Sequence, residues 1–402
     1  MIYTPKEYLE DRLQNPQRSQ LNTIQSIVLY LFLIVNTFQY SIWGIFEPIY
    51  GYLRVLSIIL VILLALTIPI KRVLYTIKAN QFTRWFCILL GVFSLLSFSL
   101  YAFFNANIDF STHRDLLLTI ITLIIGYNLS LSKGQLARYI YTYIIAASIS
   151  ALSILMRFGI HISSFYFEGV YKNQIGVFLG IFSIISISLL FSQDIKNRQK
   201  RNVLLLCSII LLLTIAILRA RTSLLFVFAV IVYSIAINKS MKTKNKLFIF
   251  ACIAVIFIAF SGEIYRIFVA NKDVSDLNNI SSGRIGRILD GLTFLKNHPL
   301  SGSLWQEQYS GGIIHVYILK RYVDYGLLLS IPITILYVYT WCVTLKNILV
   351  NKRNFIKALA PLILLFILLV SLNEYSYPFS PLSSIFIVYL LFGNYLSTST
   401  RH

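Results

Sequence analysis

Long apolar runs separated by short polar segments, most of them basic, fill the greater part of this 402-residue chain. A helix needs about 20 apolar residues to cross the hydrocarbon core of a bilayer. The repeated pattern therefore predicts an all-α, polytopic membrane protein with about twelve membrane-spanning helices. The expected spans are 23–44, 53–70, 84–104, 116–131, 138–158, 174–192, 202–218, 222–238, 246–261, 314–344, 354–372 and 380–397. The span at 314–344 exceeds one crossing, so its first turns are expected to project beyond the lipid.

The segment 262–313 interrupts this pattern because it contains no apolar run of membrane length. Within it, Ser281 or Ser282 is a suitable N-cap for a helix that extends to about Asn297, and the proline after His298 ends that helix. Apolar residues recur there at three- and four-residue spacing: Ile285, Ile288, Leu289, Leu292 and Leu295. Arg284, Arg287 and Asp290 fall off this stripe. Such an amphipathic helix is expected to lie on the membrane surface.

Composition agrees with this pattern. With 57% hydrophobic and 12% charged residues, the chain cannot be a soluble globular protein of ordinary type. We expect one transmembrane domain over residues 1–402, with 262–313 as its single large loop. Residues 1–22 are polar and lack the apolar core of a signal peptide, so the first span is expected to act as its own signal anchor.

The formal net charge of +20 comes from basic residues that are dispersed over many loops. A nucleic-acid-binding protein would concentrate such residues in one patch or stripe, so this class is disfavoured. Lys and Arg favour the cytoplasmic side of short loops. Here they gather in alternate loops if the N-terminus is cytoplasmic, which assigns both termini to the cytoplasm and segment 262–313 to the periplasm or cell exterior.

The sequence lacks the signatures of several common enzymes. No GxxxxGK[ST], HExxH or GxSxG motif occurs in a suitable context. Five histidines are scattered without carboxylates at ligand spacing, and four cysteines lie in separate apolar runs without paired spacing. We therefore expect no metal and no cofactor.

Two arginine pairs fall on the predicted external side. Arg219 and Arg221 lie between closely spaced spans, where a guanidinium is costly unless it faces a polar cavity or an anion. Arg284 and Arg287 lie on the first turn of the surface helix, whose N-terminus adds positive partial charge. Snorkelling side chains and a solvated helix face are the respective alternatives. Because guanidinium groups match phosphate oxygens, two pairs on one side favour a site for a lipid-linked diphosphate.

His315 follows two glycines at the start of span 314–344. An imidazole at this boundary can accept a proton from a hydroxyl near neutral pH, whereas an interfacial hydrogen-bonding role is the alternative. One base beside two arginine pairs suits glycosyl transfer from a lipid diphosphate. The arginines would stabilise the departing diphosphate, and the base would activate the acceptor hydroxyl.

Short motifs over roughly residues 165–345 carry a resemblance to a known family. They are Lys172-Asn173-Gln174-Ile175-Gly176, Arg221-Thr222-Ser223-Leu224, Ser282-Gly283-Arg284, Asn297-His298-Pro299-Leu300-Ser301-Gly302, His315-x-Tyr317 and Asp324-Tyr325-Gly326-Leu327. In this order they resemble the O-antigen polymerase and O-antigen ligase superfamily of bacterial surface-polysaccharide assembly. Ala220 stands where that family often has a small hydroxyl residue, and His298 is an insertion into its Asn-Pro-Leu-x-Gly turn.

The resemblance implies a GT-C-like, metal-independent glycosyltransferase of the bacterial inner membrane with its active site facing the periplasm. Its substrate would be an oligosaccharide repeat unit linked to undecaprenyl diphosphate, and a chain-length regulator would be a further partner. The resemblance assigns diphosphate binding to Arg221 and Arg284. It assigns a catalytic or acceptor-orienting role to His315. The residues expected to bind substrate beside these three are Arg219, Arg287, Lys172, Asn173, Tyr317 and Asp324.

Three functions follow from these observations. The first is a polymerase that transfers a growing glycan to the non-reducing end of another lipid-linked repeat unit. An O-antigen ligase, which would transfer the polymer to lipid A-core, is the nearest alternative because it cleaves the same sugar–diphosphate bond. A flippase or secondary transporter is the alternative from another class, although such proteins place ionisable residues near the bilayer midplane, where this sequence has few.

Overall fold

The structure is a computed structural model. It describes residues 23–41, 49–129, 133–158, 172–191, 197–237, 241–259, 261–262, 265, 278, 281, 283–305, 309–351, 355–379 and 385–399. The secondary structure of this part of the chain is helical, without strands, so the all-α prediction is confirmed there. Segment 1–22 and most of 263–282, including Ser282, lie outside the described residues.

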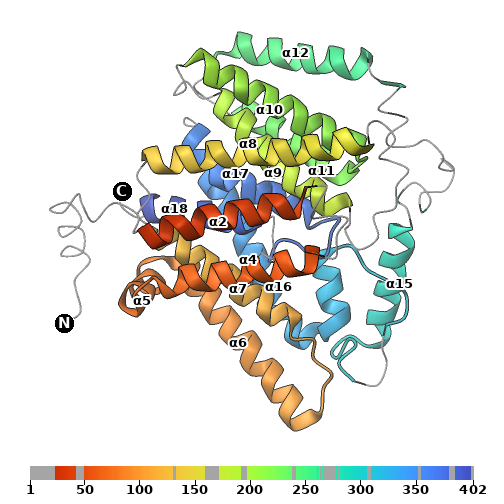
Figure 1. Ribbon diagram of the computed structural model, residues 1–402. Coiled ribbons are helices and arrows are strands. Elements are labelled where there is room, and N and C mark those ends of the chain that lie inside the picture. The colour runs from red at the N-terminus through yellow and green to blue at the C-terminus, as the bar shows by residue number, and fades with distance from the viewer. Residues whose placement is uncertain are drawn as a thin grey trace.

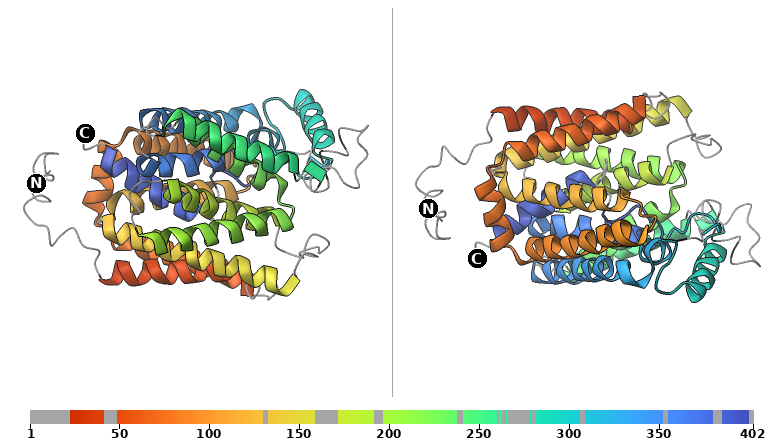
Figure 2. Two further views of the ribbon diagram at one scale, coloured as in Figure 1. Left: turned by 90° about the horizontal axis from the view of Figure 1, so that it is seen from above. Right: turned by 90° about the horizontal axis from the view of Figure 1, so that it is seen from below.

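Most of the helices run side by side in a bundle, and α15 crosses one end of that bundle at a steep angle (Figures 1 and 2). The bundle contains α2 (Thr23–Gln39), α4 (Ile49–Leu66), α6 (Gln81–Phe104), α7 (Ser111–Asn128), α8 (Lys133–Phe158), α9 (Lys172–Phe191), α10 (Arg198–Ile217), α11 (Arg221–Ile237), α12 (Thr243–Ala259), α16 (Tyr317–Val350), α17 (Phe355–Val370) and α18 (Phe386–Ser399). The short helix α5 (Ile70–Ala79) lies across the end of the bundle opposite α15 (Figure 2). The crossing helix α15 spans Arg284–Asn297. α2 begins and α18 ends at the side of the bundle opposite α15 (Figure 2).

A helix occupies the centre of each apolar run that was expected to span the membrane. Within the described residues, six helices are long and apolar enough to cross a bilayer: Ile49–Leu66, Gln81–Phe104, Gly134–Arg157, Lys172–Phe191, Arg198–Ile217 and Tyr317–Val350. The interval between the expected spans 53–70 and 84–104 needs a correction, because it holds the short helix α5. A separate α6 follows, capped by the Asn80 side chain, which accepts a hydrogen bond from the Thr83 N–H.

The outer helices expose apolar side chains to an extent that lipid, rather than water, accommodates. Leu66 is 75% exposed, and on α6 Phe98 is 64% and Phe103 79% exposed. On the same α6, Phe86 and Phe93 are buried against the rest of the bundle. Large continuous apolar faces of this kind are rare on soluble monomers. The exposed faces therefore fit a membrane-embedded protein.

The centre of the bundle is formed around α9, which packs against α8, α10, α11 and α17. Its approach to α11 depends on a glycine, because a Cβ at Gly176 would lie 2.4 Å from the Ala220 Cβ. Small residues at such crossings let helix backbones come close. This contact sets the first turn of α9 beside the turn that joins α10 to α11. It also explains why a small residue is needed at position 220.

The crossing of α7 and α18 depends on glycines in both helices. A Cβ at Gly126 would lie 2.1 Å from the Leu390 carbonyl oxygen, and one at Gly393 would lie 2.2 Å from the Leu123 carbonyl oxygen. These neighbours are backbone atoms, so no side-chain rotation can make room for a larger residue. The two helices would have to move apart.

We expect Gly126→Val to destabilise the protein by about 2–3 kcal/mol, because overpacking against backbone forces helix displacement. Thermal unfolding of purified protein in detergent measures the effect as a lower Tm. Gly91→Val is the matched control, since a Cβ at Gly91 in α6 meets no atom within 4 Å. Equal Tm values for the two variants would contradict the close crossing.

α16 is interrupted at Gly326, which has φ 63° and ψ −174° within the helix. The long span expected at 314–344 is therefore two helical segments joined at this residue. The turn that follows α15 packs against the break: Leu327 N–H donates to the Pro299 carbonyl at 3.0 Å, and Ser303 N–H donates to the Val323 carbonyl at 2.9 Å. The backbone of the turn at 297–302 thus packs directly against the backbone around Gly326.

α15 has a different N-terminus from the one expected. The residue before it is Gly283, with φ 77° and no side-chain cap. Ser281 still contributes, because its Oγ accepts a hydrogen bond of 3.2 Å from the Ile285 N–H. The helix ends at Asn297 as predicted. Along α15, three residues of the apolar stripe are exposed, namely Ile285, Leu289 and Leu292.

Candidate functional site

Polar side chains from five separate parts of the chain meet at the end of the bundle that α15 crosses. They come from the first turn of α9, the turn between α10 and α11, α15, the residues before α16, and the turn after α17. We call this group the Glu374 site, and its members are Lys172, Asn173, Arg219, Arg221, Arg284, Arg287, His315 and Glu374. All of them except Glu374 were expected from the sequence.

The carboxylate of Glu374 joins three of these parts. Its Oε1 accepts a hydrogen bond of 2.7 Å from Asn173 Nδ2 and one of 2.9 Å from Arg284 Nη2. The other guanidinium nitrogen, Arg284 Nη1, donates to the Asn373 carbonyl at 3.0 Å. Glu374 Oε2 lies 3.7 Å from His315 Nδ1. The side chain of Glu374 is only 12% exposed, so these partners replace most of its contact with water.

The second nitrogen of His315 determines which tautomer fits this geometry. Its Nε2 lies 3.0 Å from Arg287 Nη1. A guanidinium can only donate hydrogen bonds, so this imidazole nitrogen accepts and carries no proton. The proton of the neutral ring is therefore on Nδ1, which faces Glu374. The contact with Arg287 also covers the lone pair that a general base would use.

The spacing of residues along α15 places its two arginines, Arg284 and Arg287, on the face that packs against the bundle. Arg284, Arg287 and Gly291 are spaced by three and four residues and so share one face of the helix. A Cβ at Gly291 would lie 2.7 Å from the Ile314 side chain, so the absence of a side chain lets α15 approach the segment that precedes α16. Arg287 is one turn before this contact and His315 one residue after Ile314, which brings the two side chains together.

The other cations of the site interact with one another, and among the described residues no carboxylate is paired with Lys172, Arg219 or Arg221. Lys172 interacts electrostatically with Arg221, Arg219 and Arg284, and Arg221 with Arg219 and Arg284. Arg219 also has φ 50°, a left-handed backbone conformation that costs a non-glycine residue about 1 kcal/mol. Neighbouring cations repel one another, and a bound anion would relieve this repulsion. The arrangement therefore favours binding of an anion.

The charge of the site defines which anion fits. Lys172 and four arginines face the single carboxylate of Glu374 within the described residues. Arg284 and His315 are 23% and 21% exposed, so a ligand can reach them without unfolding the site. Guanidinium groups form paired hydrogen bonds with phosphate oxygens. A group with several negative charges, such as a diphosphate, matches this excess.

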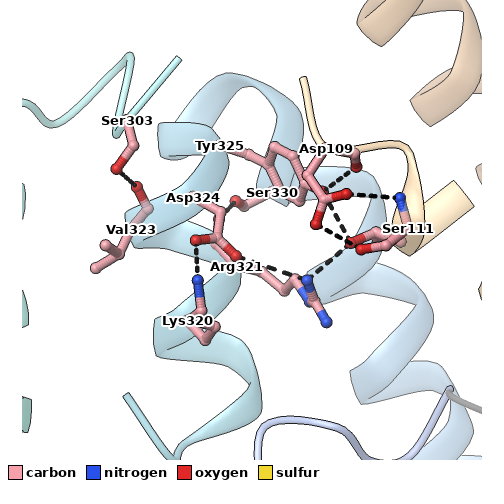
Figure 3. Close-up of polar contacts among 10 residues, drawn as sticks. Asp109, Ser111, Ser303, Lys320, Arg321, Val323, Asp324, Tyr325 and Ser330 are labelled. Atoms are coloured by element: carbon pink, nitrogen blue, oxygen red, sulfur yellow. Dashed lines mark hydrogen bonds and ion pairs between the residues drawn. The ribbon is translucent and has the colours of Figure 1, made fainter. Parts of the chain in front are cut away.

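Two residues that were expected to bind substrate lie elsewhere. Tyr317 is 2% exposed, and its ring stacks on Tyr337 in the core with centroids 5.7 Å apart. Asp324 forms ion pairs with Lys320 and with Arg321 (Figure 3). The physical reason is the helix geometry of α16, which turns these side chains away from His315 at its start. Within the described residues, no hydrogen bond or ion pair joins Tyr317 or Asp324 to the Glu374 site.

Asp324 belongs to a separate polar cluster that ties α16 to the first turn of α7 and to Asp109 just before it (Figure 3). Arg321 Nη1 donates to Thr112 Oγ1 at 2.7 Å, and the Tyr325 hydroxyl donates to the Asp109 carbonyl at 2.9 Å. Burial raises the pKa of Asp109, but hydrogen bonds from Ser111 and the nearby Arg321 charge outweigh it, and the net pKa is lowered. This cluster is internally paired and braces the first segment of α16.

Glu374 was not singled out from the sequence. The signal that could have identified it is its position: an acidic residue in the short interval between the last two apolar runs, on the predicted external side. An acidic residue beside a predicted span is unfavourable without a partner wherever it enters the membrane. Its partners come from distant parts of the chain, so their identity could not be predicted.

The chain matches no protein-family model and no curated protein.

Proposed function

We propose that this chain is a polysaccharide polymerase of the O-antigen polymerase type, working in the bacterial inner membrane. It would transfer a growing glycan from undecaprenyl diphosphate to the non-reducing-end hydroxyl of another lipid-linked repeat unit on the periplasmic side. About twelve membrane spans and a GT-C-like arrangement belong to this proposal.

One observation carries the proposal: cationic side chains from distant segments surround an imidazole and a carboxylate at one end of an apolar helix bundle. A lipid-linked diphosphate places its anionic group at this level, because its hydrocarbon chain stays in the bilayer. The exposed apolar residues of α15, such as Leu289 and Leu292, support a position of that helix against lipid.

The residues fit a one-step transfer. Arg221 and Arg284 would bind the diphosphate and stabilise the charge that develops as the sugar C1–oxygen bond breaks. The acceptor oxygen forms the new bond to C1, and its proton passes to His315 Nε2. The diphosphate leaves with the bonding electron pair. Lys172, Arg219 and Arg287 would hold the remaining phosphate oxygens, and Asn173 positions Glu374.

The test is reconstitution of purified protein in liposomes with a synthetic lipid-linked repeat unit, without nucleotide sugar. We expect a ladder of polymer on the lipid carrier. A product only when lipid A-core is added would favour the ligase, and movement of the lipid across the bilayer without any new glycosidic bond would favour the flippase. In cells, loss of a polymerase leaves a single repeat on the core, whereas loss of a ligase leaves lipid-linked polymer unattached.

A further inference from the structure

Glu374 stands at the point where the anion-binding and proton-accepting parts of the site meet. Its Oε1 is bound by Arg284 at 2.9 Å, and its Oε2 faces His315 Nδ1 at 3.7 Å. A carboxylate and a phosphate offer a guanidinium the same kind of paired oxygen acceptors. Glu374 therefore competes with an incoming diphosphate for Arg284 while it also faces the imidazole.

The orientation of the His315 ring shows how Glu374 could also act on the imidazole. With Nε2 accepting from Arg287, Nδ1 carries the proton and is directed toward Glu374. The distance of 3.7 Å is slightly too long for a hydrogen bond, and Nδ1 is buried without a hydrogen-bond partner. A small movement of the carboxylate away from Arg284 would complete this bond.

We propose that Glu374 is a positioning residue that exchanges partners during the reaction, an inference that rests on the proposed function. Donor diphosphate takes Arg284 from the Glu374 carboxylate and draws Arg287 off His315 Nε2. The released carboxylate then accepts the hydrogen bond from His315 Nδ1–H. Binding of the donor thus exposes the Nε2 lone pair and orients the imidazole in the same event.

The glycosyl transfer conserves atoms and charge. The acceptor hydroxyl loses its proton to His315 Nε2, its oxygen bonds to the sugar C1, and the diphosphate departs with the C1–oxygen electron pair. Glu374 gains no proton; its negative charge stabilises the imidazolium that forms. Asn173 keeps its hydrogen bond to the carboxylate and limits how far it moves.

The decisive variant is Glu374→Gln, which keeps the size of the side chain and an oxygen for Asn173 and Arg284 but removes the charge. Two effects of opposite sign are expected. Binding of undecaprenyl diphosphate in nanodiscs should tighten about 3–10-fold, because the competing charge is gone. Turnover at saturating donor should fall about 10–100-fold, because the imidazolium loses its partner. A damaged fold would weaken both properties together.

Two variants serve as controls. Glu374→Asp keeps the charge with a shorter reach, and we expect near-wild-type affinity with a smaller loss of kcat. Asp115→Asn is the same carboxylate-to-amide change in an ion pair with Arg114, outside the Glu374 site. It should leave affinity and turnover unchanged, and Tm of each variant verifies folding.

Each outcome decides the proposal. Weaker or unchanged binding in Glu374→Gln overturns the competition, and unchanged turnover overturns the positioning of His315.

If wild-type protein makes no polymer, the proposed function fails, but two measurements still test the role of Glu374. These are the binding comparison, repeated with inorganic pyrophosphate as the headgroup alone, and ¹⁵N NMR of labelled histidine. A proton on Nε2 rather than Nδ1 of His315 would overturn the assigned tautomer and the proposal with it.

Discussion

Arg284→Ala is expected to lower polymer formation by about 10²–10³-fold while the protein still folds. Two guanidinium nitrogens of Arg284 donate hydrogen bonds, at 2.9 Å to Glu374 and 3.0 Å to the Asn373 carbonyl. The same fork would hold two phosphate oxygens of the donor, where charge accumulates as the sugar leaves. Alanine removes both donors and the charge, so kcat should fall. The amount of folded protein should stay close to that of the wild type.

The measurement is the initial rate of ladder formation in liposomes, with Tm as the folding check. Arg284→Lys keeps the charge without the planar fork, and we expect an intermediate rate. Arg114→Ala provides the control: Arg114 pairs with Asp115, and its side chain is 50% exposed. Exposed pairs of this kind contribute little to stability. Wild-type rates in Arg284→Ala would remove this residue from the diphosphate-binding role.

Gly326→Ala is expected to have the largest effect on stability, a loss of more than about 3 kcal/mol. Gly326 has φ 63°, a conformation that L residues rarely adopt. A Cβ there would also lie 2.2 Å from the Leu300 carbonyl oxygen and 2.5 Å from the Ser301 carbonyl carbon. Both neighbours are backbone, so the turn after α15 would be pushed away from α16. Since α15 carries Arg284 and Arg287, activity should fall together with stability.

Thermal unfolding and expression in the membrane fraction measure this prediction. Gly302→Ala should behave alike, because Gly302 has φ 54° and its Cβ would lie 2.4 Å from the Gly326 nitrogen. Gly134→Ala in α8 is the matched control, since a Cβ at Gly134 meets no atom within 4 Å. A Gly326→Ala variant as stable as Gly134→Ala would mean that α16 is not broken at this residue.

Much of the fold could be predicted because its determinants are local. The apolar runs that were expected to span the membrane contain the bundle helices, and α15 ends at Asn297 as its His-Pro boundary required. The errors have physical causes as well. α5 is too short and too polar to stand out beside its neighbours, and Gly283 replaces a serine cap because it can adopt φ 77°.

The candidate site was predictable only in part. Arginines and a histidine on one predicted side of the membrane are a pattern in sequence, and the structure brings Arg284 and His315 to the same carboxylate. Tyr317 and Asp324 are expected in the site because they belong to motifs that resemble those of the family. The turn of α16 instead directs Tyr317 into the core and Asp324 to Lys320.

Sequence alone determined which parts of the chain are apolar and helical, because burial in lipid and the helix period act over neighbouring residues. The tertiary structure decided which charged groups face one another. Glu374 receives Asn173 from 201 positions away and Arg284 from 90 positions away. Such pairings depend on helix packing at glycines such as Gly176 and Gly291, where backbones approach because no side chain intervenes. That information resides in the packed bundle and not in any local segment.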